Sequence, residues 1–211
     1  MIYLESQDNM FQRKIGGIFV LRSELADQYL MSELWETERM IIRDANLQDV
    51  DRLQEIYTQS RSTEGWTRDD ELTPDYVLNG VVKGHLPPNG MKEFYKIQVI
   101  IHKNSFEIIG FIEFYHGYPV KEVLYIATLL LCDDYRNNRY GQEVINKLCK
   151  QAHGLGFHQA RLGVSLRNWL GIYFWTKLGF DTIIKYCGNK MLSKDSYASL
   201  ELGKNLKRMQ V

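Results

Sequence analysis

One stretch in the second half of the chain decides the fold: Leu129-Leu130-Leu131-Cys132-Asp133-Asp134-Tyr135-Arg136-Asn137-Asn138-Arg139-Tyr140-Gly141-Gln142. Its first residues end the apolar run 123–132, and such a continuous run predicts a central strand that is covered on both faces. A polar turn follows and opens directly into a helix predicted from about Tyr140. The first N–H groups of a helix have no intrahelical partner, and the helix dipole adds positive potential there. The turn is therefore predicted to bind an anion such as a pyrophosphate.

The side chains of this turn are compatible with an anion site. Asparagine tolerates a left-handed backbone, so Asn137 and Asn138 can shape the loop. Arg136 and Arg139 add positive charge where phosphates would lie. The alternative is an ordinary strand-turn-helix connection whose arginines are solvated.

The rest of the chain alternates between strand and helix patterns on both sides of this turn. The order is roughly β-α-α-β-β-β-α-β-α-β-β, which indicates an α/β domain built on one mixed sheet. Strands are predicted at residues 39–43, 95–101, 108–115, 122–132, 160–166, 181–186 and 198–202, and helices begin near Asn46, Pro74, Tyr140 and Asn168.

The first 36 residues form a predicted extension to a domain of residues 37–211. Apolar residues recur at loosely helical spacing within the extension, so we expect an amphipathic helix there. The helix could pack on the domain or on a partner subunit, which leaves a homodimer open, and a lid over a substrate site is the other interpretation.

Composition excludes several classes of function. Lys+Arg and Asp+Glu both number 26, and this zero net charge argues against a nucleic-acid partner. The three cysteines are far apart, which favours a reducing cytoplasm over a disulfide framework or a zinc site, and the five histidines form no metal-binding pattern. No segment resembles a secretory signal, and the longest apolar run is about half the length that spans a bilayer. We therefore expect a cytoplasmic protein without a metal, a membrane anchor or a nucleic-acid partner.

The turn resembles the acyl-CoA loop of GNAT acetyltransferases, whose pattern is Q/R-x-x-G-x-G/A. Arg136 matches the first position of that pattern and Gly141 the last. Arg139 stands at the middle glycine, where a residue with a Cβ requires a negative φ or accepts strain.

Residues 168–180 resemble a second motif of the same family, N-x-x-A-x-x-L-Y-x-K-x-G-F. Residues 38–45 also resemble its opening strand, so the resemblance covers about residues 37–206. In the second motif Asn168, Lys177, Gly179 and Phe180 match, Gly171 replaces the alanine, Phe174 replaces the leucine and Trp175 replaces the tyrosine.

The resemblance implies a GNAT-like α/β fold with a mixed, mostly antiparallel central sheet of about six or seven strands flanked by helices. It also implies an N-acetyltransferase that uses acetyl-CoA as co-substrate and a primary amine as acceptor. In the family, the central strand separates from its parallel neighbour at a bulge, and the pantetheine arm fills the gap. Carried over to this chain, the residues that bind acetyl-CoA are Leu129, Leu130, Leu131, Arg136, Asn137, Asn138, Arg139, Tyr140, Gly141, Gln142, Asn168 and Trp175.

The chemistry implied is direct attack of a neutral amine on the thioester, which requires a proton acceptor. Glu113 and Glu122 are the candidate bases, because each lies in or beside a strand near the expected cleft. The tyrosine that donates a proton to the leaving thiolate in many relatives is Trp175 here, and an indole is a very poor acid. Tyr173 is a candidate substitute, although it lies roughly 200° around the helix from position 175 and fits a core position better.

Two other classes of function compete with this interpretation. One is a non-catalytic acyl-CoA-binding sensor, which the replacements Arg139 and Trp175 favour. The other is a nucleotide-binding doubly wound domain, which ranks lower because the turn is poor in glycine and lies late in the chain. The sequence does not identify the amine acceptor.

Overall fold

The computed structural model describes residues 30–62, 73–189, 191 and 196–207. The chain divides into two compact units, Met1–Leu30 and Met31–Val211, and every element below belongs to the second. The amphipathic helix predicted within the N-terminal extension falls on residues 1–29 and therefore lies outside the described residues.

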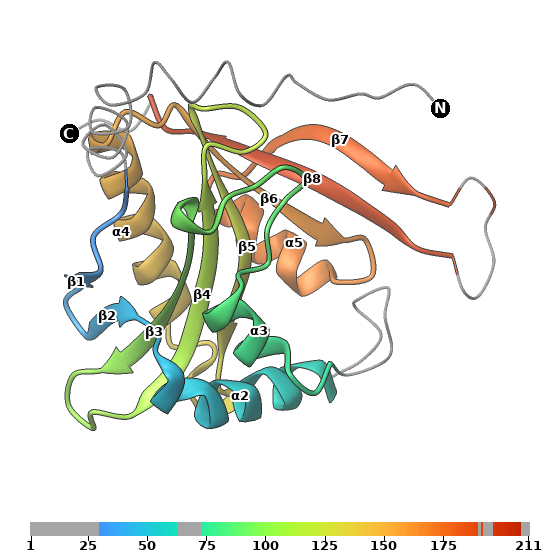
Figure 1. Cartoon of the computed structure of the whole chain (residues 1–211). Coiled ribbons are helices and arrows are strands. Elements are labelled where there is room, and N and C mark those ends of the chain that lie inside the picture. The colour runs from blue at the N-terminus through green and yellow to red at the C-terminus, as the bar shows by residue number, and fades with distance from the viewer. Residues whose placement is uncertain (1–29, 63–72, 190, 192–195, 208–211) are drawn as a thin grey trace, which may run out of the picture. The chain divides into compact units, whose positions relative to one another are not determined.

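The second unit contains both strands and helices (Figure 1). None of its described helices is both long enough and apolar enough to cross a membrane. Its strands are β1 (Leu34–Glu36), β2 (Met40–Asp44), β3 (Tyr95–His102), β4 (Ile108–His116), β5 (Val123–Leu131), β6 (Gln159–Ser165), β7 (Thr182–Gly188) and β8 (Ala198–Asn205). Its helices are α2 (Val50–Ser62), α3 (Tyr76–Val82), α4 (Tyr140–Gly154) and α5 (Trp169–Lys177), with short 3-10 turns η2 (Leu47–Asp49), η3 (Lys92–Phe94) and η4 (Asp133–Tyr135).

The described strands form one sheet in the order β1-β2-β3-β4-β5-β6-β8-β7. Neighbours are antiparallel except for β5 and β6, which run parallel. The predicted fold class, a mixed and mostly antiparallel sheet flanked by helices, is confirmed, with eight strands in place of six or seven. The additional strand is β1, which lies in the stretch assigned to the helical extension. Leu34 and Glu36 are exposed while Trp35 is buried, an alternation that suits the edge of a sheet.

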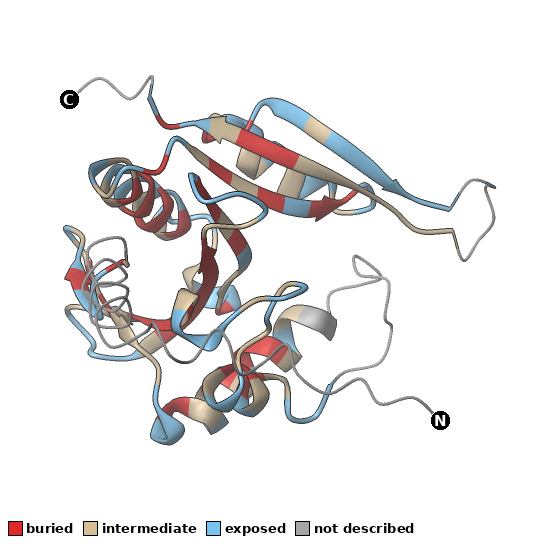
Figure 2. Ribbon diagram, turned by 45° about the horizontal axis from the view of Figure 1, so that its top comes forward, coloured by how far each residue is buried: buried red, intermediate tan, exposed pale blue. Residues whose placement is uncertain are grey.

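The sheet separates two hydrophobic cores. One face packs against α4 and α5, and the other packs against α2 and α3. Strand β4 alternates between them, since Ile112 and Phe114 join the first core and Phe111 and Tyr115 join the second. Figure 2 shows the buried positions concentrated in the central strands and α4, while β7 is mostly exposed. By this alternation Glu113 faces α2 and α3.

A bulge in β5 changes which face its side chains point to. Phe114 of β4 pairs with Ile126, but Glu113 pairs with Thr128, so Ala127 is an extra residue. Because strand side chains alternate with a period of two, the extra residue exchanges the two faces beyond it. Thr128 therefore points to the α2 and α3 side, next to Glu113.

The parallel pairing of β5 and β6 stops at the same place. Its last pair is Ile126 with Leu162, although β5 continues to Leu131 and β6 to Ser165. Within the described part of the chain, the facing edges of the two strands beyond this pair are not bonded to each other. The two strands therefore leave a gap in the middle of the sheet.

His116, the last residue of β4, forms hydrogen bonds to two other segments of the domain. Its Nδ1 donates to the Phe94 carbonyl over 2.8 Å, and its Nε2 accepts from the Met31 N–H over 3.0 Å. The imidazole must be neutral to accept this second bond. Burial lowers the pKa of His116 from 6.5 to about 4, so the neutral form dominates near neutral pH.

We expect His116 to make the folded state sensitive to acid. Because its pKa is lower in the folded state, its contribution is complete above pH 6.5 and is lost as the pH falls toward about 4. The shift corresponds to about 3 kcal/mol at most. Thermal unfolding between pH 7.5 and 4 should therefore show a shallower loss of Tm for His116→Gln than for the unaltered chain. Parallel Tm curves for the two proteins would contradict the assignment.

Candidate active site

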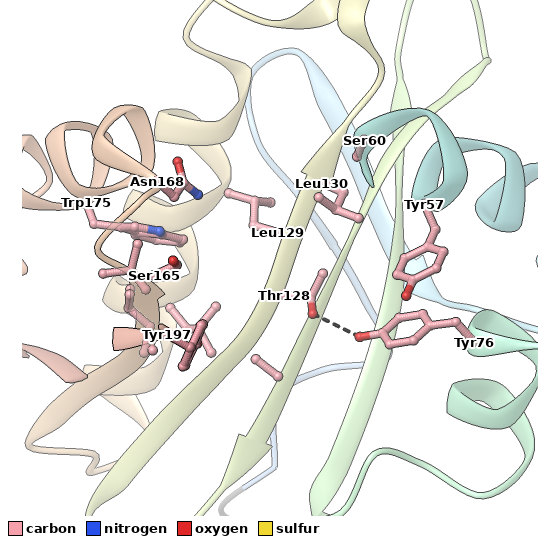
Figure 3. A pocket seen from close by; sticks show the side chains of 15 residues that line it. Tyr57, Ser60, Tyr76, Thr128, Leu129, Leu130, Ser165, Asn168, Trp175 and Tyr197 are labelled. Carbon is pink, nitrogen blue, oxygen red and sulfur yellow. Dashed lines mark hydrogen bonds between the residues drawn. The ribbon is translucent and has the colours of Figure 1, made fainter. Parts of the chain in front are cut away.

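A cavity of about 290 Å³ occupies the gap between β5 and β6. Figure 3 shows side chains of α2 and α3 on one side of β5 and side chains of β6 and α5 on the other. Within the described residues, the lining contains hydroxyl, amide and aromatic groups but no charged side chain. The lining residues are Tyr57, Ser60, Tyr76, Ile126, Ala127, Thr128, Leu129, Leu130, Leu162, Gly163, Val164, Ser165, Asn168, Trp175 and Tyr197.

Helix α4 begins directly after the turn that follows β5. Its N-cap residue is Arg139, whose side chain forms no capping hydrogen bond to the described residues, and the first intrahelical bond runs from Glu143 N to Arg139 O. The N–H groups of residues 140–142 thus precede the hydrogen-bonded part of the helix. Arg139 has a φ of 64° and Asn137 a φ of 63°, both left-handed. The turn therefore accepts strain at Arg139, where the family pattern has glycine.

Arg136 ties this turn to the end of β5. Its Nε donates to the Leu131 carbonyl over 3.1 Å, and its Nη2 donates to Ser60 Oγ over 3.0 Å. Its Nη1 forms an ion pair with Asp133 at 2.8 Å. The guanidinium is thus fixed beside Ser60, which lines the cavity. Part of its charge is already neutralised by Asp133.

Arg39, in the connection before β2, binds both the turn and the first turn of α4. Its Nε lies 2.7 Å from Glu143 Oε2, and its Nη1 donates to the Asn138 carbonyl over 3.2 Å. Its guanidinium also lies over the ring of Tyr140, 4.2 Å from the centroid. Tyr140 therefore positions the start of α4, and its hydroxyl lies 3.2 Å from His102 Nε2.

Gly141 lets the start of α4 approach the sheet. A Cβ at this position would lie 3.3 Å from Phe174 Cζ and 3.5 Å from a Leu129 methyl. The first contact is tighter than van der Waals distance, so a larger side chain would push the helix start away from β5. Gln142, the next residue, is exposed and carries one of the three N–H groups that precede the hydrogen-bonded part of the helix.

Asn168 and Trp175, two of the residues predicted to bind acetyl-CoA, both line the cavity. Asn168 is the N-cap of α5 and accepts a hydrogen bond from Gly171 N over 2.7 Å. Trp175 is half-buried and packs edge-on against Phe174 and Phe180. Asn168 therefore has a structural role that needs no ligand.

A buried carboxylate lies next to the cavity on the α2 and α3 side. Glu113 is fully buried, and its Oε2 accepts a hydrogen bond from the Tyr76 hydroxyl over 2.9 Å. The same hydroxyl lies 3.2 Å from Thr128 Oγ1, and both Tyr76 and Thr128 line the cavity (Figure 3). Burial, together with the charge of Glu113, raises the pKa of Tyr76 far above its ordinary value. Tyr76 is thus a neutral phenol that links the cavity to Glu113.

Two candidate catalytic residues are not brought to the cavity. Glu122 is exposed and directly precedes the first residue of β5. The gap opens at the other end of this strand, beyond the bulge. Tyr173 is 55% exposed, so the predicted core position is wrong, and its ring lies under Lys177 Nζ at 4.4 Å. Neither residue is among the described residues that line the cavity. We therefore do not retain Glu122 as a base or Tyr173 as an acid.

Several lining residues were not identified from the sequence. The rings of Tyr57 and Tyr76 stack with centroids 4.1 Å apart and form the wall on the α2 and α3 side. Ser165 and Tyr197 lie on the opposite side, near Trp175 (Figure 3). Tyr57 follows Val50 and Leu53 at helical spacing, so periodicity alone assigns it to the core and gives no sign of the cavity.

The described residues contain no group of three or more His, Cys, Asp or Glu side chains placed to hold a metal ion. The buried acid next to the cavity is a single carboxylate hydrogen-bonded to a phenol. The arrangement can remove a proton from a group in the cavity, and it can bind an anion at the start of α4.

Comparisons with known proteins identify the family. A search of curated protein sequences gave no match. Solved structures share the fold at low identity. An acetyltransferase (GNAT family) from Bacillus anthracis is 16% identical with a TM-score of 0.63, covering 83% of this chain and 99% of that chain.

Two further structures have the same fold. The protein yncA from Salmonella typhimurium, solved with its cofactor acetyl-CoA, is 15% identical with a TM-score of 0.57, covering 82% of this chain and 98% of that chain. A spermidine N-acetyltransferase SpeG chimera from Vibrio cholerae and hSSAT is 12% identical with a TM-score of 0.62, covering 81% and 98%. The model of the acetyltransferase (GNAT) family matches residues 51–180, more than half of this sequence. The chain therefore belongs to the acetyltransferase (GNAT) family.

Proposed function

We propose that this chain is an N-acetyltransferase that transfers an acetyl group from acetyl-CoA to a primary amine by direct attack in a ternary complex. One observation carries the proposal: the gap that opens between β5 and β6 at the Ala127 bulge lies beside the N-terminus of α4, since a Cβ at Gly141 would lie 3.5 Å from the side chain of Leu129, which lines the cavity. The family match supports the acetyltransferase class, and yncA is a neighbour of the same fold that holds acetyl-CoA. Cys132 and Cys149 are buried free thiols and Cys187 is an exposed one, which suits the cytoplasmic location that we also propose.

The residues of the gap fit acetyl-CoA. Residues 129–131 and 163–165 have backbone edges that could bond the amides of the pantetheine arm, because β5 and β6 no longer pair there. The N–H groups of residues 140–142 could bind the pyrophosphate, with Arg139 beside them. When bound, acetyl-CoA supplies an acyl group that is already activated as a thioester.

We propose that Glu113 takes the proton from the amine through Tyr76. Glu113 is fully buried and is not among the described lining residues, so the amine would contact Tyr76 rather than Glu113. The Tyr76 oxygen can accept a proton from the amine while its own proton passes to Glu113 Oε2, 2.9 Å away. A phenol that stays neutral can do both, because it is donor and acceptor at once.

We propose that Trp175 packs against the ligand and does not deliver a proton. Its indole N–H is a hydrogen-bond donor only, so the departing thiol must find its proton elsewhere. A thiol has a pKa of about 8.5, so CoA can leave as the thiolate. Trp175 is therefore a wall of the cavity on the α5 side.

Thiol release tests the activity directly. The chain is incubated with acetyl-CoA and, in turn, spermidine, phenylethylamine, kanamycin, a lysine-containing peptide and a peptide with a free N-terminus. Spermidine is included because the Vibrio cholerae chimera is a spermidine N-acetyltransferase, and phenylethylamine because two stacked phenols form one wall. We expect free CoA to form with at least one amine, together with the acetylated amine in the mass spectrum. Binding of acetyl-CoA without thiol release from any of the five would favour the acyl-CoA-binding sensor instead.

Replacing Arg139 with glycine tests how the turn binds acetyl-CoA. The left-handed φ of 64° strains an arginine, so Arg139→Gly should relieve strain while it removes one charge. We expect the Kd for acetyl-CoA, measured by calorimetry, to stay within about threefold of the unaltered value or to improve. Asn137→Gly, at a φ of 63°, is the matched control without a change of charge. A loss of more than about tenfold, ~1.4 kcal/mol, in Arg139→Gly alone would show that the arginine itself binds phosphate.

A further inference from the structure

The second oxygen of Glu113 faces a histidine. His85 lies in the loop after α3, and its Nδ1 is 3.3 Å from Glu113 Oε1. This nitrogen is buried, whereas 29% of the His85 side chain is exposed. The imidazole therefore reaches from a fully buried carboxylate to solvent. His85 is not among the described residues that line the cavity, so this contact leads away from the acceptor.

The backbone at Gly80 makes room for this contact. A Cβ at Gly80 would lie 3.1 Å from His85 Cε1, 3.0 Å from Tyr95 Oη and 3.4 Å from Glu113 Oε1. All three side chains converge on the buried surface of this glycine. The ring of Tyr76 also packs on His85, with centroids 4.2 Å apart. The imidazole is thus held in position on two sides.

Neighbouring titratable groups are less suited to carry a proton. Burial raises the pKa of Tyr95, so this phenol stays neutral and its hydroxyl is enclosed. Lys92 donates to the Gly80 carbonyl over 2.9 Å and lies over the Tyr95 ring, and burial lowers its pKa. Tyr76 faces the cavity side of Glu113. His85 is therefore the titratable group that joins Glu113 to solvent on this side.

We propose that His85 exports the proton of the reaction from Glu113 to solvent, an inference that rests on the proposed function. An ammonium acceptor and acetyl-CoA give an amide, free CoA and one proton, and this proton must leave the site. It enters the Glu113 carboxyl at Oε2 from Tyr76. The carboxyl then turns half-way about its Cγ–Cδ bond, a two-fold torsion, and gives the proton to His85 Nδ1. His85 then loses the Nε2 proton to water, which leaves the neutral tautomer protonated at Nδ1. A half-turn of the ring and proton exchange with water restore the starting tautomer before the next turnover.

The test is rescue of His85→Ala by imidazole. Removal of the imidazole should make proton transfer from Glu113 to solvent the rate-limiting step. We expect kcat for thiol release to fall about tenfold, measured with whichever of the five amines reacts fastest. Added imidazole should restore the rate in His85→Ala and have no effect on the unaltered chain. His158→Ala, which removes an exposed histidine directly before β6, is the matched control and should behave as unaltered. An unchanged kcat in His85→Ala, or a loss in a folded variant that imidazole does not restore, would overturn the proposal.

A second readout needs no turnover. With ¹⁵N-labelled histidine and no substrate, Glu113→Gln should shift the imidazole signals of His85 and leave those of His158 in place. Unshifted His85 signals would show that the contact is absent in solution and would overturn the proton exit. Failure of the unaltered chain to release thiol would overturn the proposed function instead, so the two failures are distinguishable.

Discussion

Glu113→Gln is expected to lower kcat for thiol release by about a hundredfold or more, with little change in the Kd for acetyl-CoA. The amide keeps the volume of the carboxylate and can still accept the Tyr76 hydrogen bond, but it cannot take a proton. Because Glu113 is fully buried and glutamine has nearly the same volume, the replacement should leave the packing of the core intact. Thiol-release kinetics, calorimetry with acetyl-CoA and thermal unfolding provide the three measurements.

Glu122→Gln is the matched control, since it makes the same chemical change at an exposed carboxylate away from the cavity. We expect its kcat to equal that of the unaltered chain. Tyr76→Phe should resemble Glu113→Gln, because it interrupts the link between the cavity and Glu113. Near-normal turnover in a folded Glu113→Gln variant would rule out Glu113 as the base.

Gln142→Glu is expected to have opposite effects on folding and on ligand binding. An acidic residue in the first turn of a helix interacts favourably with the helix dipole, so Tm should hold or rise slightly. The same charge beside the N–H groups of residues 140–142 should repel the pyrophosphate. We expect the Kd for acetyl-CoA, measured by calorimetry at low salt, to rise about tenfold or more, ~1.4 kcal/mol.

Asn146→Asp adds the same charge to an exposed position of α4, one turn further along the helix. The field of a helix terminus falls off within the first turn, so this variant should bind acetyl-CoA almost normally. Increasing the salt concentration should reduce the difference between the two variants. Equal affinities for Gln142→Glu and the unaltered chain would place the pyrophosphate away from the start of α4.

The strand and helix order was readable from the sequence because local signals agreed with the fold. Asn46 does cap the turn before α2, as expected, with Asp49 completing the capping box, and Asn168 caps α5. The exception is β1, where three residues carry too short a pattern to reveal an edge strand. Trp35 fits either a helix or a strand on periodicity alone, and its pairing with Ile42 of β2 makes it part of a strand.

The site was less predictable, because it depends on which side chains of β5 point to each face of the sheet. Without the bulge at Ala127, strand alternation would place Thr128 on the α4 face, away from Tyr76. The pairing of Glu113 with Tyr76 and His85 likewise joins residues that are 37 and 28 positions apart in the chain. Such contacts are set by topology, which one sequence does not display. The strand that follows Glu122 was predicted correctly, but the sequence did not show at which end of it the gap opens. Glu122 precedes the first residue of β5, whereas the gap opens beyond Ile126.

Calorimetry with acetyl-CoA and with acetylpantetheine, which lacks the pyrophosphate and nucleotide, tests most directly where the ligand binds. Acetylpantetheine can contact only the gap between β5 and β6, whereas acetyl-CoA can also contact the N–H groups at the start of α4. We predict that the unaltered chain binds acetyl-CoA at least about a hundredfold more tightly, ~2.7 kcal/mol, and that Gln142→Glu removes much of this difference. Equal affinity for the two compounds would contradict the assignment of the turn after β5 as the pyrophosphate site.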